Sequence, residues 1–98
     1  MGPLTLKTVL RRSTEVASRL FEGQMLIITP DDSMLHRLNE VGTYIWEYLE
    51  APHSIEQICT AVEERFSDFD HTRNCEEIIG FLEDIRAKKM IVAENGNE

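Results

Sequence analysis

The sequence lacks several features that mark large classes of proteins. No run of about 18 apolar residues occurs among its 98 residues, so no segment is expected to span a membrane. Residues 1–12 lack the apolar stretch of a secretory signal. A glycine-rich phosphate loop, a Ser-His-Asp set and a paired-acid site are also missing, which predicts a protein that is not an enzyme and holds no cofactor.

Cysteine is sparse. Cys59 and Cys75 fall on expected helices and form no Cys-x-x-Cys pair. This usage fits two ordinary half-buried thiols in a reducing cytosol, so we expect a cytoplasmic protein. The three histidines and two cysteines match no zinc finger or ribbon spacing, and a structural zinc site needs four convergent ligands. We therefore predict no metal site.

Positive charge is scarce in the second half of the chain. Residues 40–98 carry five Lys/Arg and fourteen Asp/Glu, a net of −9, whereas residues 1–39 have a net of +1. An acidic surface repels phosphate, which makes nucleic acid a poor partner.

Length and composition indicate one domain. Apolar residues make up 42 % of the chain, enough for one modest core. We expect a flexible leader over residues 1–12, a single domain over 13–93 and a frayed end over 94–98. The protein is expected to be a monomer or a weak dimer.

The first half predicts three strands in an antiparallel meander. Glu15–Phe21 alternates imperfectly, and Gln24–Thr29 is a short β-branched run typical of a central strand. The third strand is Ser33–Leu38. Glu22–Gly23 and the segment 30–33 are rich in turn formers and reverse the chain between the strands.

Three helices are predicted after the strands. Asn39 can cap the first, over about residues 40–50, which has one apolar stripe; Trp46 lies off this stripe. Ser54 caps the second helix, with Gln57 as its capping-box partner. The third runs from near Asn74 to residues 88–89, and residues 90–93 can add a strand or close the core.

The order of these elements and one signature resemble a known family. The signature consists of Leu38–Gly42, Ile45–Trp46, Leu49, Ser54–Ile55 and Ile58, followed by Glu77, Phe81–Leu82 and Ile85. These residues are similar to those of the PqqD-like family, named for the pyrroloquinoline quinone synthesis protein D. Its members are also called RiPP precursor peptide recognition elements.

The resemblance implies an α+β fold, a three-stranded antiparallel meander followed by three helices in a winged-helix-like arrangement. It also implies a peptide-binding chaperone, which binds the leader of a ribosomally made precursor peptide and presents it to a modifying enzyme, often a radical SAM enzyme. In the family the leader adds as a strand beside the third strand, in a groove against the last helix. Strand addition needs an open sheet edge, which a three-stranded meander has.

Carried onto this chain, the groove would be lined by two short segments. The candidate peptide-binding residues are Met34, Leu35, His36, Arg37 and Leu38 of the third strand and Ile79, Leu82, Glu83 and Arg86 of the last helix. Arg37 and Arg86 at the mouth would suit an amphipathic, partly acidic leader.

Two other functions stay open. One is a winged-helix transcriptional regulator that binds DNA through the last helix. That helix has Glu76 and Glu77 near its start, where a reading helix places Arg, Asn or Gln, so the sequence disfavours this function. The other is a non-catalytic protein-interaction domain that does not bind a leader.

The charge distribution generates the first testable prediction. Because residues 40–98 carry a net of −9, association with duplex DNA should be undetectable at physiological salt. A gel-shift titration measures it. A sequence-specific shift at that salt would instead support the regulator.

Overall fold

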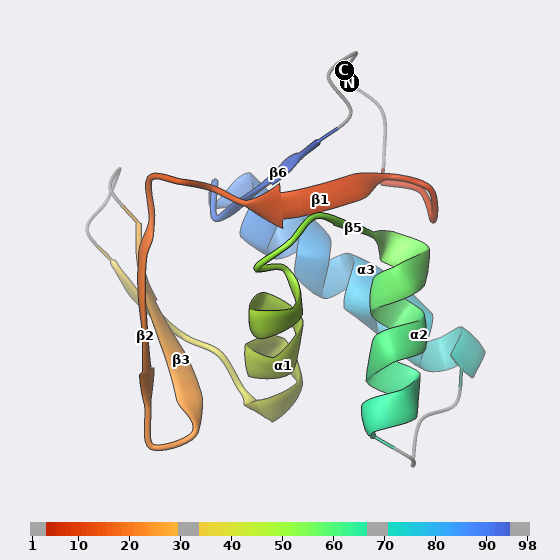
Figure 1. Ribbon diagram of the computed structural model, residues 1–98, viewed down its shortest axis with the longest axis horizontal. Helices are drawn as coiled ribbons and strands as arrows, with labels where there is room; N and C mark the ends of the chain where they lie inside the picture. Colours follow the sequence, from red (N-terminus) through yellow and green to blue (C-terminus); the bar gives the residue numbers. More distant parts are fainter. Residues whose placement is uncertain (1–3, 30–33, 67–70, 95–98) are drawn as a thin grey trace.

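The computed structural model describes residues 4–29, 34–66 and 71–94, with the backbone alone for 71–74. These residues form three helices and two small three-stranded antiparallel sheets, which confirms the α+β class (Figure 1). In chain order the elements are β1 Val9–Arg12, β2 Ala17–Phe21, β3 Gln24–Ile28, β4 Leu35–Arg37, α1 Glu40–Tyr48, β5 His53–Ser54, α2 Ile55–Arg65, α3 His71–Ala87 and β6 Ile91–Ala93.

The predicted meander is present as the sheet β2-β3-β4. Strand β3 pairs Leu26 with Arg19 on one side and with Arg37 on the other. The β2–β3 hairpin turns at Glu22 and Gly23, whose φ values of 51° and 83° are those of a tight two-residue turn. The turn predicted at 30–33 lies outside the described residues.

A second sheet, β5-β1-β6, lies along the top of the view in Figure 1, whereas the β2–β3 hairpin lies at the left. The expectation of a flexible leader over residues 1–12 is wrong for its described part. Strand β1 pairs with both β5 and β6, and Leu10 is fully buried. Strand β6 confirms that residues 90–93 can both add a strand and close the core, because Met90 and Ile91 are buried. Glu94 is held as well, since its N–H donates to the carbonyl of Val9.

Both predicted helix caps are confirmed. The side chain of Asn39 accepts a hydrogen bond from the N–H of Gly42 at 2.8 Å and thereby begins α1. Ser54 and Gln57 form a reciprocal capping box at the start of α2. Such caps satisfy N–H groups that have no partner inside a helix. Helix α3 begins at His71, three residues earlier than predicted, and part of the loop expected before it lies outside the described residues.

Arg12 fastens β1 to the end of α1. Its guanidinium donates to the carbonyl of Trp46 through Nε at 2.9 Å and Nη2 at 2.6 Å, and it lies 5.0 Å from the centre of the Trp46 ring. The last turn of α1 has no basic residue of its own, so Arg12 supplies the cation that a helix C-terminus favours. Burial lowers the pKa of Arg12, and the carboxylates of Glu50 and Glu47 oppose this change. Trp46, which lies off the apolar stripe, is 1 % exposed and belongs to the core.

Thr43 joins the meander to α1. Its buried hydroxyl oxygen accepts a hydrogen bond from the N–H of Met25 at 2.9 Å and donates to the carbonyl of Leu38 at 3.3 Å. Met25 also accepts from the N–H of Leu38 at 2.9 Å. Where β4 has left the sheet, the threonine thus replaces a ladder partner for β3.

The two cysteines are joined. Cys59 of α2 and Cys75 of α3 form a disulfide, with their Cα atoms 5.6 Å apart, so the expectation of two ordinary thiols is wrong. Their positions differ by 16 in the sequence, and the bridge ties one helix to the other. None of the helices in the described ranges is both long and apolar enough to cross a membrane.

The threonine bridge generates a stability prediction. Thr43→Val keeps the side-chain shape but leaves the N–H of Met25 buried without a partner, which should lower the free energy of unfolding by about 1–3 kcal/mol. Thr43→Ser keeps the hydroxyl and serves as the control, with a smaller loss. Urea unfolding measures both. Equal stability of the valine variant and the parent protein would show that the hydrogen bond is dispensable.

Candidate functional site: an open strand edge and an adjoining pocket

Strand β4 is an edge strand of the meander, paired with β3 alone among the described residues. The N–H of Leu38 and the carbonyl of Met34 bond to the β3 side, at 2.9 and 3.4 Å. In an antiparallel pair, residues that bond to the neighbour alternate with residues whose N–H and C=O point away from it. The backbone groups of His36 therefore point toward β3, and those of Leu35 and Arg37 point to the open edge.

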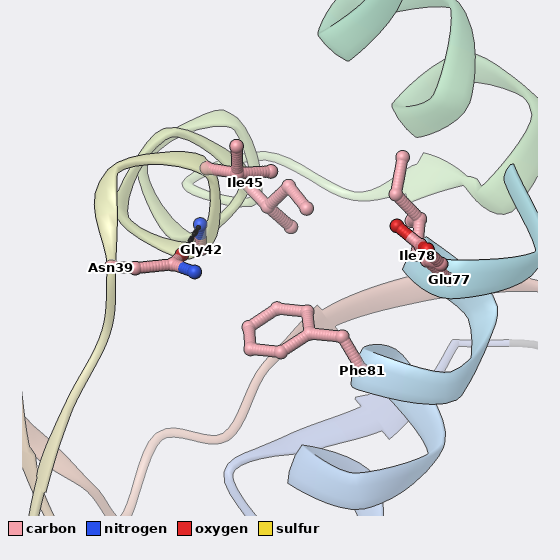
Figure 2. Close-up of a pocket in the computed structure, with 7 residues that line it drawn as sticks. Asn39, Gly42, Ile45, Glu77, Ile78 and Phe81 are labelled. Carbon is pink, nitrogen blue, oxygen red and sulfur yellow. Dashed lines mark hydrogen bonds between the residues drawn. The ribbon is translucent and has the colours of Figure 1, made fainter. Parts of the chain in front are cut away.

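A pocket of about 200 Å³ lies directly after this strand, between α1 and α3 (Figure 2). The lining consists of Asn39, Val41, Gly42 and Ile45 from the start of α1 and Glu77, Ile78 and Phe81 from α3. Apolar side chains predominate in this lining, with one amide and one carboxylate. It is large enough for one bulky apolar side chain and has the mixed chemistry typical of a binding pocket.

Gly42 and Phe81 lie close together in the lining of the pocket. The Phe81 ring extends from α3 toward Gly42, as Figure 2 shows. A Cβ atom placed on Gly42 would come within 3.1 Å of Phe81 Cζ and 3.2 Å of Leu38 Cβ. Such contacts are tighter than ordinary van der Waals packing. The Phe81 ring can therefore occupy this position because residue 42 has no side chain.

The five candidates in and next to β4 differ in how exposed their side chains are. Met34 and Leu35 are 54 % and 58 % exposed, although both are large and apolar. Arg37 is exposed, and His36 is half-buried with its Nε2 atom buried and unpaired among the described residues. Leu38 is buried and packs in the core.

On α3, the four candidates stand at i, i+3, i+4 and i+7 of one helix face, but they differ in burial. Ile79 and Arg86 are half-buried and Glu83 is exposed. Leu82 is fully buried in the core, so its predicted place on the outward side of α3 is wrong. The pocket uses Glu77, Ile78 and Phe81 instead, one turn nearer the start of α3.

None of the nine candidates lines the pocket, although Leu38 precedes its first residue. A signal for the lining was present in the sequence, since Gly42, Ile45, Glu77 and Phe81 belong to the signature quoted above. The charged residue of the lining is Glu77, and Arg37 and Arg86, which were expected at the mouth of the groove, are not part of this lining. No group of three or more His, Cys, Asp or Glu side chains that could hold a metal ion occurs in the part of the chain that the structure describes.

An edge strand that ends at an apolar pocket defines a class of site that takes an extended peptide. The family model of coenzyme PQQ synthesis protein D (PqqD) matches residues 24–91, and the chain belongs to this family. A solved structure, TbiB1 in complex with the TbiA(beta) leader peptide, has the same fold. The TM-score is 0.75 and the identity 20 %, over 90 % of this chain and 99 % of that chain. No curated protein matches the chain significantly.

Two glycines give a matched pair of variants that tests the pocket geometry. Gly80→Ala in α3 has no heavy atom near its new Cβ and should raise the free energy of unfolding by about 0.5–1 kcal/mol through helix propensity. Gly42→Ala should lose this gain and shift the Phe81 ring, because its Cβ meets the ring. Urea unfolding and the ring proton shifts of Phe81 measure both effects. A Gly42→Ala protein as stabilised as Gly80→Ala, with unchanged ring shifts, would contradict the assigned contact.

Proposed function

We propose that this protein binds the leader segment of a ribosomally made precursor peptide as an added strand along β4. Membership of the PqqD family supports this, and so does TbiB1, which has the same fold and whose structure was solved with a leader peptide. The observation that carries the proposal is the open edge of β4 ending at the apolar pocket. In this view the protein is a non-catalytic recognition element.

The edge and the pocket have separate parts in this function. The outward N–H and C=O groups of Leu35 and Arg37 pair with the peptide backbone and supply affinity for any extended segment. The pocket takes one bulky apolar side chain of the leader and supplies selectivity. Backbone pairing together with well-packed side-chain anchors should give about micromolar affinity, roughly −8 kcal/mol. Of the candidate residues, Leu38 and Leu82 then support the site from the core, whereas Met34, Ile79, Glu83 and Arg86 flank it.

The second half of the proposal is presentation of the bound peptide to a modifying enzyme, such as a radical SAM enzyme. The outer face of the meander supports it. Leu35 and Ile28 are direct neighbours there and are 58 % and 47 % exposed, and the next row places Leu26 between Arg19 and Arg37. Exposed apolar patches of this kind are common in protein interfaces. Because such precursors are made on ribosomes, we place this work in the cytoplasm.

Proline variants of the two sheet edges test the mode of binding. Leu35→Pro removes one outward N–H of β4, and Ser18→Pro removes one outward N–H of β2 at the far edge. Neither N–H group donates a hydrogen bond within the described sheet, so both variants should fold. Leu35→Pro should lower the affinity for the leader by about tenfold or more, because one hydrogen bond to the added strand is lost and the proline ring intrudes at the contact. Ser18→Pro should leave the affinity unchanged.

The affinities are measured by calorimetry with the leader of the short precursor encoded nearest to the gene, and by amide shifts in the parent protein. Shifts should gather on residues 34–42 and 76–83. Shifts that gather on α2, or a folded Leu35→Pro protein with parent affinity, would contradict strand addition at β4.

A further inference from the structure

The disulfide lies close to the pocket along α3. Cys75 precedes Glu77 by two residues and Ile78 by three, and both of these line the pocket. The part of α3 that lines the pocket, Glu77, Ile78 and Phe81, is called the pocket wall. The disulfide ties the turn of α3 where this wall begins to α2. Cys59, at the other end of the bridge, is 4 % exposed and belongs to the core.

The two halves of α3 are anchored differently. Its second half is held by Leu82 and Ile85, which are 0 % and 2 % exposed. Among the side chains described in its first half, Ile78 is buried, Ile79 is half-buried against the core, Cys75 is half-buried and bridged, and Glu76 and Glu77 are exposed. Because helix ends have unsatisfied backbone groups and open locally, a covalent tie matters most in such a turn.

We propose that the Cys59–Cys75 disulfide is a redox-sensitive fastening of the pocket wall. In the oxidised protein the first half of α3 is ordered and the pocket is formed; in the reduced protein this half opens more often and the pocket is less populated. The consequence for leader affinity rests on the function proposed above. Disulfides in a reducing compartment are commonly transient or redox-sensing, which suits a tie of this kind.

The chemistry requires a dithiol reductant. Its thiolate attacks Sγ of Cys75, which is more exposed than Cys59, and forms a mixed disulfide. The Cys59–Cys75 bond breaks, and its electron pair leaves on Sγ of Cys59, which then takes a proton. The second thiolate of the reductant attacks the mixed disulfide and releases Cys75, which is protonated in turn. The protein gains two electrons and two protons, and the dithiol becomes a disulfide.

Hydrogen exchange of the intact protein tests the fastening without any peptide. Amide exchange is followed by residue in the oxidised protein and after reduction with dithiothreitol. Reduction should speed exchange of residues 76–81 by about tenfold or more, while β1 and β6 of the same sample stay within about twofold. The double variant C59A/C75A, where it folds, should exchange at the reduced rate with or without dithiothreitol. Unchanged exchange at 76–81, or an equal increase throughout the protein, would overturn the proposal.

A binding measurement separates this proposal from the proposed function. The probes are the leader of the nearest encoded precursor and the TbiA(beta) leader peptide. Reduction should lower the affinity of the parent protein for the probe by about threefold or more. It should have no effect on the affinity of the double variant. Equal affinity in both redox states, with exchange changed, would overturn redox control of binding and leave the proposed function intact. If neither probe binds in either state, the proposed function fails, and the exchange result alone decides whether the disulfide fastens the pocket wall.

Discussion

The position of the site depends on the two hydrogen bonds that the buried hydroxyl of Thr43 makes to the backbone. This hydroxyl takes the N–H of Met25 at the point where β4 leaves the sheet, and it reaches the carbonyl of Leu38 on the other side. Without this pair, a buried backbone donor would have no partner, at a cost of about 1–3 kcal/mol. One side chain of α1 thus fixes the helix against the meander.

This constraint joins the two parts of the site. The chain passes from the edge strand to Asn39, which caps α1 and lines the pocket, within two residues of Arg37. Gly42 then lets the Phe81 ring come close to α1. An extended peptide on β4 would therefore meet the pocket where the edge strand ends, without any change in the fold.

The meander and the helix caps could be predicted because they depend on local interactions. Turn residues reverse the chain where they stand, and Asn39 and Ser54 each bond to a residue three positions later. Strand β1 was missed because its partners lie more than 40 residues away in sequence and its four residues have no periodicity. The disulfide was missed for a related reason, since it depends on how two helices pack. The α3 residues that line the pocket were not predicted, because the sequence shows which face of a helix is apolar but not how that helix is rotated against α1. Leu82 consequently lies in the core, whereas Phe81 lines the pocket.

Amide protection at the open edge of β4 tests whether a leader peptide binds there as an added strand. Hydrogen exchange is measured for Leu35, His36 and Arg37 with and without bound leader peptide. Strand addition predicts that the amides of Leu35 and Arg37, which point away from β3, become protected on binding, while that of His36, already paired, changes little. A bound leader that leaves the exchange of Leu35 and Arg37 unchanged would contradict strand addition at β4.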